Sequence, residues 1–297
     1  MRAEDVRTIG VVGAGTMGQQ IALLGALHGF TVGVHDAIGE ALKKAEAWAH
    51  TYLDGRVDKG RLARAEADAA LCRLTFASDL AGAVGQADLV IEAIVEKLEA
   101  KRDLFAQLDR LTPPHALLAT NSSTIVSSRL MDVTSRPEKV LNLHFFNPPL
   151  VMELVEVCRN AKTTDETVAV AMGTCRRLGK SPILLKREIF GFVVNRLLWA
   201  VGNEAMSLVE QGIATPEEID TAMVKGARYP IGPFALMDMN GIDVGYLVRM
   251  ERYRESGNEA DRPPRIMVEK YEKGEWGRKT GKGWYDHSTQ GAEGRKP

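Results

Sequence analysis

The sequence predicts an α/β fold, a Rossmann-type doubly wound and mainly parallel sheet followed by an all-α C-terminal domain. In the first part of the chain, short β-branched runs alternate with helical stretches, which is typical of parallel strands joined by crossover helices. From about Glu188 onward the pattern is helical with little sign of strands. We therefore expect a sheet domain over residues 1–186 and a helical domain over residues 187–297.

The first elements are a strand over residues 8–13, a helix over 16–28 that stops at Gly29, and a strand over 30–36. About 35 residues rich in Ala, Lys, Glu, Arg and Leu then follow, which is longer than a simple crossover needs. Because glycines break this stretch, we expect a helical hairpin over about 38–70 that projects from the sheet. Further strands are expected at 73–76, 87–92, 116–120, 140–143 and in the run after 153, with a helix over 97–111.

The C-terminal part predicts one long apolar-periodic helix from Phe190 to Glu210, ending at Gly212. Thr215 and Glu218 form a capping-box pattern that opens the next helix. The polar stretch 254–264 predicts a surface loop.

The bulk composition excludes several classes of protein. The chain has 297 residues, of which 45% are hydrophobic and 26% charged, near the averages of globular proteins. A net charge of -1 gives no reason to expect nucleic acid or an anionic membrane as a partner. We expect no membrane span, because no apolar run approaches about 18 residues. We also expect no signal peptide, because the N-terminus leads straight into a strand without a basic region and an apolar region before it. Cys72, Cys158 and Cys175 lack metal-type spacing and predict reduced, buried thiols of a cytoplasmic protein.

A G-x-G-x-x-G motif, formed by Gly13, Gly15 and Gly18, lies between the first strand and the first helix. In that context the motif predicts a dinucleotide site, with the pyrophosphate at the helix N-terminus. Asp36 ends the next strand and would accept hydrogen bonds from the adenosine ribose. It would repel a 2′-phosphate, and Ala37 offers no arginine to bind one, so the predicted cofactor is NAD.

His144 and Glu156 form a candidate catalytic dyad. His144 ends one strand, and Glu156 stands between Val155 and Val157 in the next apolar run. An ionised carboxylate in such a run is costly unless it is paired, and a histidine with such a partner becomes a general base near neutral pH. The alternative is a structural histidine and an outward-pointing glutamate.

The loop Asn121-Ser122-Ser123-Thr124 follows the strand that ends at Thr120. Since ligands of such sheets lie beyond the carboxyl ends of the strands, this loop and His144 are expected on the side of the cofactor. The alternative function of the loop is to cap a helix.

These motifs together resemble the monofunctional L-3-hydroxyacyl-CoA dehydrogenases, including the 3-hydroxybutyryl-CoA dehydrogenases, over nearly the whole chain. In this family the serine loop usually reads Asn-Thr-Ser-Ser, and the difference here bears on acyl-chain preference. The segments that carry the resemblance are 13–18, 92–96, 121–124, 144–156, 191–196, 229–234 and 277–285.

The resemblance implies NAD-dependent, reversible oxidation of a (S)-3-hydroxyacyl-CoA to the 3-oxoacyl-CoA, in fatty-acid metabolism. His144 is the implied general base and Glu156 the group that orients it. Ser123 is implied to bind the substrate's 3-oxygen or the cofactor, and Asn195 to hold the acyl chain.

The resemblance also implies that Met17, Glu96 and Lys101 contact NAD. Lys59, in the projecting hairpin, aligns with a lysine that contacts coenzyme A, and the arginines around it suit the phosphates of that ligand. Family members pair through the C-terminal domain, so a homodimer is expected.

Two other functions stay open. A dehydrogenase of a free hydroxy acid, of the gulonate or carnitine type, would share the fold and the dyad. A non-catalytic NAD-binding relative would keep the scaffold alone, since fold does not establish function.

Overall fold

The computed structural model describes residues 1–288 and divides into two compact units, Met1–Val193 and a second that begins at Val194. The last residues of the predicted helical domain, 289–297, lie outside the described residues. The segment just before the division belongs to the first unit, because Phe192 is buried there against Cys158 and Leu185.

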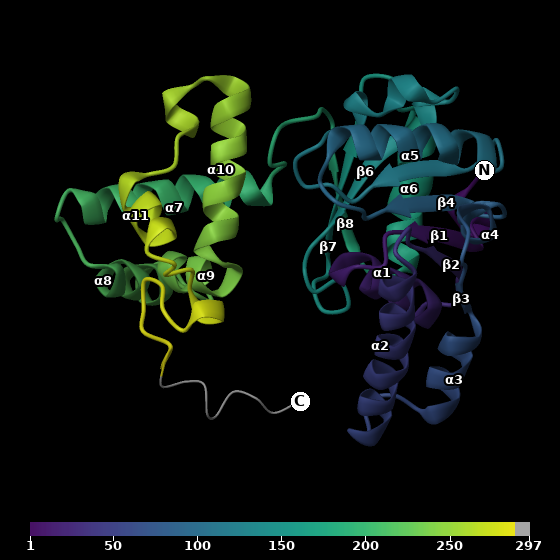
Figure 1. The fold of residues 1–297 in the computed structure, drawn as a ribbon, viewed down its shortest axis with the longest axis horizontal. Helices are drawn as coiled ribbons and strands as arrows, with labels where there is room; N and C mark the ends of the chain where they lie inside the picture. Colours follow the sequence, from purple (N-terminus) through teal and green to yellow (C-terminus); the bar gives the residue numbers. More distant parts are fainter. Residues whose placement is uncertain (289–297) are drawn as a thin grey trace. The chain divides into compact units, whose positions relative to one another are not determined.

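The first unit is built on one eight-stranded sheet with the order β3-β2-β1-β4-β5-β6-β7-β8 (Figure 1). Neighbouring strands are parallel except β6 and β7, which are antiparallel. This confirms the predicted doubly wound, mainly parallel fold. The strands are β1 (Thr8–Val12), β2 (Thr31–His35), β3 (Leu74–Phe76), β4 (Leu89–Glu92), β5 (Leu117–Thr120), β6 (Val140–Phe145), β7 (Leu154–Arg159) and β8 (Ser181–Leu185).

Helices cover both faces of this sheet, so its central strands are buried on both sides. One apolar cluster joins the sheet to residues of α1 and α6, and a second joins it to residues of α4 and α5. Every residue of β4, β5 and β6 is buried, as the apolar runs predict for inner parallel strands. These helices are α1 (Thr16–Leu27), α4 (Leu80–Val84), α5 (Leu98–Leu111) and α6 (Asp165–Arg177).

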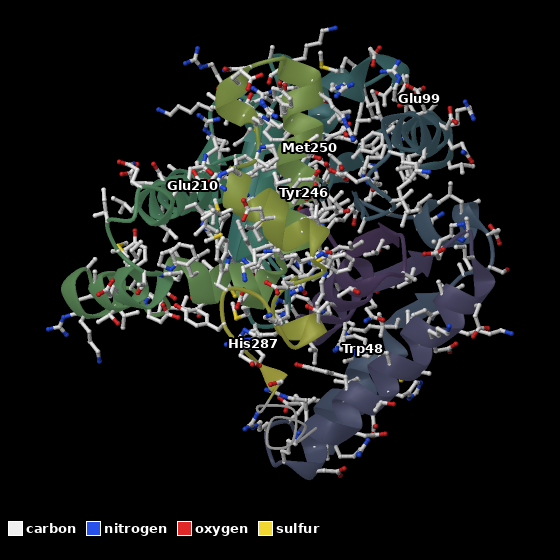
Figure 2. The ribbon with its side chains drawn as sticks, turned by 60° about the vertical axis from the view of Figure 1, so that its left-hand side comes forward. Trp48, Glu99, Glu210, Tyr246, Met250 and His287 are labelled. Atoms are coloured by element: carbon white, nitrogen blue, oxygen red, sulfur yellow. The ribbon has the colours of Figure 1, made fainter. Side chains whose placement is uncertain are left out.

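The long crossover after β2 forms two helices, α2 (Gly39–Asp58) and α3 (Arg64–Cys72), which lie side by side in Figure 1. The ring of Trp48, labelled on α2 in Figure 2, lies 5.2 Å from the ring of Tyr52 one turn later. At the far end, Nη1 of Arg64 lies 2.7 Å from Oδ1 of Asp54 and ties the helices together. Cys72 is exposed, so the expectation that all cysteines are buried was wrong, because α3 buries only Ala67 and Ala70.

The second unit is helical in the residues described. Its core contains Met206, Phe234, Ile242 and Met267, and Figure 2 labels Tyr246 and Met250 one turn apart on α10. Thr215 and Glu218 exchange the two hydrogen bonds of the predicted capping box. The helices are α7 (Val194–Glu210), α8 (Pro216–Thr221), α9 (Pro233–Asn240), α10 (Ile242–Ser256) and α11 (Arg265–Glu272).

Two boundaries in this part were predicted wrongly. The helix expected from Phe190 begins at Val194 instead, because Gly191 and Phe192 have φ angles of 74° and 49°, which a right-handed helix excludes. Part of the expected loop 254–264 is helical, since α10 continues to Ser256 and ends where Gly257 turns left-handed with φ of 62°. Among residues 1–288, no helix has the length and apolar character needed to cross a bilayer.

Candidate functional site

The glycine turn between β1 and α1 is shaped for close approach of a ligand. Gly13 has φ of 101°, and a Cβ on Gly18 would lie 1.7 Å from the carbonyl oxygen of Gly13, so both positions require glycine. Gly15 caps α1, and a Cβ placed on it would meet no atom within 4 Å. The backbone at the start of α1 is therefore open to a phosphate, which this helix terminus attracts. Met17 follows in the first turn and packs against the core.

Asp36 follows β2, and two backbone donors fix its carboxylate. Oδ2 accepts from the amide of Ala14 at 2.7 Å, and Oδ1 accepts from the amide of Ile38 at 2.8 Å. Asp36 thus joins the glycine turn to the end of β2. Since a carboxylate has about four acceptor positions, it can still accept hydrogen bonds from two ribose hydroxyls.

His144 and Glu156 lie opposite each other on the antiparallel strands β6 and β7. Nδ1 of His144 lies 2.8 Å from Oε2 of Glu156, and both side chains are buried. The other oxygen of Glu156 accepts from the amide of Val193 at 2.9 Å. A buried carboxylate beside Nδ1 favours the tautomer that carries its proton on Nδ1, so Nε2 is the acceptor.

Aromatic rings surround this pair. The ring of Phe146 lies 4.6 Å from the imidazole of His144, and that of Phe192 lies 5.3 Å away. Nε2 of His144 has no hydrogen-bond partner within residues 1–288. An oriented imidazole with an available Nε2 in an apolar setting can remove a proton from a bound hydroxyl.

The serine loop is fastened beside His144. The amide of Phe145 donates to Oδ1 of Asn121 at 2.9 Å, which ties the loop to the end of β6. The hydroxyls of Ser122 and Thr124 both donate to Oε1 of Glu96. Ser123 differs, because in the described part of the chain its hydroxyl has no protein partner.

A network of charged side chains, formed by Lys101, Glu92 and Glu96, supports the serine loop. Nζ of Lys101 lies 2.6 Å from Oε1 of Glu92 and 3.2 Å from Oε2 of Glu96. Lys101 and Glu92 are 1% and 0% exposed. Burial opposes ionisation of Glu96, but Lys101 and the two loop hydroxyls outweigh it and hold the pKa of this carboxyl below its usual value.

Comparison with known proteins agrees with this geometry. Residues 8–189 match the NAD-binding domain of 3-hydroxyacyl-CoA dehydrogenase, and residues 191–287 match its C-terminal domain. The chain belongs to the 3-hydroxyacyl-CoA dehydrogenase family. It is an NAD-dependent oxidoreductase that acts on a CH–OH group, and the open glycine turn and Asp36 fit that cofactor.

Individual members of this family are similar over most of their length. The 3-hydroxybutyryl-CoA dehydrogenase of Bradyrhizobium diazoefficiens is 36% identical, over 96% of this chain and 97% of its own. The 3-hydroxyadipyl-CoA dehydrogenase of Escherichia coli is 39% identical over 95% of this chain, but only 59% of its own length is matched. The solved (S)-3-hydroxybutyryl-CoA dehydrogenase of Ralstonia eutropha has 38% identity and a TM-score of 0.89, covering 95% of this chain and 99% of its own.

The other residues expected at the dehydrogenase site lie apart from this cluster or in the second unit. Lys59 follows the last residue of α2, at the tip of the hairpin. Asn195 lies in the first turn of α7 and is partly buried.

Sequence reasoning gave no function to Glu92, Thr120 or Asn121, which the structure connects to the serine loop. The signal for Glu92 was present, because this glutamate ends an apolar strand just as Glu156 interrupts one. Its partner could not be inferred, since Lys101 looks like an ordinary solvated lysine of an amphipathic helix.

Proposed function

We propose that this dehydrogenase oxidises (S)-3-hydroxyacyl-CoA thioesters such as 3-hydroxybutyryl-CoA, reversibly, with His144 as the general base. The observation that carries the proposal is the buried pair of His144 and Glu156 at the sheet edge that also holds the glycine turn. Ligands of doubly wound sheets lie at this edge. A substrate bound at this edge would lie within reach of both the base and the hydride acceptor.

In the oxidative direction, Nε2 of His144 takes the proton of the substrate's 3-hydroxyl while C3 gives up a hydride. NAD supplies the hydride acceptor, and the former alcohol becomes a ketone. Glu156 keeps the imidazole in position and stabilises the imidazolium that forms, as the orienting group does in other proton-transfer triads. In reduction the imidazolium returns the proton.

Ser123 and Asn195 are the proposed substrate contacts. Ser123 would donate its hydroxyl to the substrate's 3-oxygen or to the cofactor, which agrees with its lack of a partner within the described residues. Asn195 would hold the acyl chain. Met17 and Glu96 are proposed to contact NAD, Glu96 through the part of its carboxylate that remains accessible. Lys101, which was also expected to contact NAD, is 1% exposed and is proposed to act on the cofactor through Glu96.

The tip of the α2–α3 hairpin is the proposed site for coenzyme A. Lys59 and Arg61 are exposed there, and Arg56 lies one turn before Lys59. Arg64 is less available, because Asp54 and Asp68 both pair with it. The cations next to Lys59 are therefore better candidates for binding phosphate.

A homodimer through the C-terminal unit is also proposed, in a cytoplasmic protein of fatty-acid β-oxidation. Leu197 on α7 and Leu247 on α10 are 62% and 53% exposed. Such apolar side chains on neighbouring helices suit contact with a second copy. Sedimentation at micromolar concentration would test this, and a monomer would contradict it.

The reaction is tested by NADH oxidation, followed by absorbance, with acetoacetyl-CoA and with free acetoacetate. Turnover of the thioester alone is the expected result. Turnover of the free acid alone would favour a hydroxy-acid dehydrogenase of the gulonate or carnitine type. NADH binding without turnover of either compound would favour a non-catalytic relative.

A further inference from the structure

The serine loop contains three consecutive hydroxyl side chains, and two of them are committed to the protein. Ser122 donates to Glu96 and accepts from the amides of Thr124 at 3.2 Å and Ile125 at 2.7 Å. Thr124 donates to the same oxygen of Glu96 at 2.5 Å. Ser123 is thus held between two anchored neighbours, and the position of its hydroxyl depends on Glu96.

Glu96 depends in turn on a buried ion pair. Lys101 bridges Glu96 and Glu92, with its ammonium group 3.2 Å and 2.6 Å from the two carboxylates. A charged lysine side chain that is 1% exposed would strongly destabilise the folded protein if no buried carboxylate were paired with it. Glu92 supplies that carboxylate, so it sets where Lys101 and Glu96 stand.

Glu92 is itself fixed from three directions. Beside Lys101, its Oε1 accepts from the amide of Ile94 at 2.7 Å, and its Oε2 accepts from the hydroxyl of Thr120 at 2.7 Å. Thr120 also accepts from the amide of Ser122 at 3.1 Å. The network therefore reaches the serine loop by two routes, through Thr120 and through Lys101 with Glu96.

We propose that Glu92 is a positioning residue of this dehydrogenase, which fixes the hydroxyl of Ser123 through Thr120 on one side and through Lys101 and Glu96 on the other. The proposal rests on the proposed function of Ser123. It also explains why Ser122-Ser123-Thr124 can replace the usual Thr-Ser-Ser. Glu96 needs a hydroxyl donor on each side of Ser123, and serine or threonine can supply it at both positions.

A double-mutant cycle between Glu92 and Ser123 tests this inference. Glu92→Gln keeps the shape but removes the charge that pairs with Lys101. We expect it to lower kcat for acetoacetyl-CoA reduction, measured at saturating NADH, about 10- to 100-fold, the cost of a misplaced group. In a Ser123→Ala background the same change should cost less than about twofold, because the residue it positions is gone.

Additive effects of the two changes would overturn the inference, and so would an unchanged kcat. If wild type turns over no thioester, the proposed function falls and this inference falls with it. If wild type turns over the thioester but the two changes have additive effects, the proposed function stands and only the proposed role of Glu92 is overturned.

A second pair of variants decides the question if Glu92→Gln does not fold. Thr124→Val removes a loop hydroxyl without touching the buried pair, whereas Thr124→Ser keeps it. We expect a loss of kcat in the first and recovery in the second. Thr51→Val is the matched control, because Thr51 is an exposed residue of α2 whose hydroxyl donates to the carbonyl of Ala47 at 3.0 Å. Equal kcat in the two Thr124 variants would overturn the inference.

Discussion

Each of the two units contains a largely buried histidine that is hydrogen-bonded to a buried carboxylate, and the hydrogen bonds of the two pairs have the same length. Nδ1 of His144 lies 2.8 Å from Glu156, and Nε2 of His287 lies 2.8 Å from Asp238. Only the first pair stands at the carboxyl edge of a parallel sheet. The distance between a histidine and its carboxylate does not by itself identify a catalytic pair.

The two pairs differ in the other hydrogen bonds that each carboxylate accepts. They also differ in the environment of the second nitrogen of each imidazole ring. Asp238 also accepts from the amides of Trp284 at 2.8 Å and Tyr285 at 3.0 Å, so it fastens the tail to α9. Nδ1 of His287 is buried with no partner within residues 1–288. The pair of His287 and Asp238 therefore fastens the tail to α9, and the second nitrogen of its ring is closed to a ligand. In the other pair, Nε2 of His144 can accept a proton from a ligand.

The largest expected difference is between His144→Ala and His287→Ala. The first should lower kcat by about 10³-fold, the contribution of a general base, while NADH still binds. The second should leave kcat within about twofold and lower the melting temperature. Steady-state rates, NADH fluorescence titration and thermal unfolding measure these effects. A rate loss of similar size in His287→Ala would break the comparison.

The next largest effect is expected from changing the carboxylates and leaving the histidines in place. Glu156→Gln keeps a group near Val193 and His144 but loses the charge that stabilises the imidazolium, so kcat should fall about 100-fold. Asp238→Asn should cost about 2 kcal/mol of unfolding free energy, because a charged acceptor of two amides is lost, with kcat nearly unchanged. Rates and urea unfolding measure the two results. A stable, fully active Glu156→Gln enzyme would remove Glu156 from the mechanism.

Sequence reasoning could predict the pair of His144 and Glu156 on neighbouring strands, but not the pair of His287 and Asp238 in the tail. An apolar run interrupted by Glu156, next to a strand ended by His144, fixes which side chains face each other once the strands are antiparallel. Their hydrogen bond is present, while their catalytic role stays a prediction. The contact of His287 with Asp238 joins residues 49 apart in sequence and depends on how the tail docks, which no local pattern encodes.

Dependence on tertiary contacts also explains the other differences between prediction and structure. The sheet, the glycine turn and the capping box follow from local periodicity and turn chemistry, so they could be predicted. The start of α7 could not, because Phe192 adopts a positive φ that side chains other than glycine rarely adopt. Nor could the network of Glu92, since Lys101 is buried by the tertiary fold.

A smaller effect is expected from changing Asp36. This change should affect cofactor affinity, whereas changes to His144 and Glu156 should affect turnover. Asp36→Ala should weaken NAD about tenfold, through loss of the ribose hydrogen bonds, and relax discrimination against NADP. Since Asp36 also accepts from the amide of Ala14, Asp36→Asn is the matched control that keeps an acceptor for the turn. Dissociation constants for NADH and NADPH measure this. An unchanged preference for NADH in Asp36→Ala would contradict the ribose interpretation.

The smallest expected effect, no reaction at all, concerns the two buried cysteines of the first unit, Cys158 and Cys175. Burial, with Glu188 and Glu156 nearby, raises the pKa of Cys158 to about 12, and burial raises that of Cys175 to about 12. At pH 8, only about one in 10⁴ of these thiols is ionised, and the thiolate is the form that reacts. Iodoacetamide at pH 8 should therefore modify Cys72, which is exposed, and spare the other two.

This labelling pattern separates lost chemistry from lost structure in the variants above. Cys158 lies on β7, two residues after Glu156, so its exposure reports opening of the strands that hold the His144 pair. Peptide mass spectrometry should find Cys158 unmodified in Glu156→Gln and in His287→Ala alike. If Cys158 reacts in Glu156→Gln, its rate loss reflects a disturbed sheet. If it reacts in His287→Ala, the tail stabilises the first unit as well, and the two pairs are not independent.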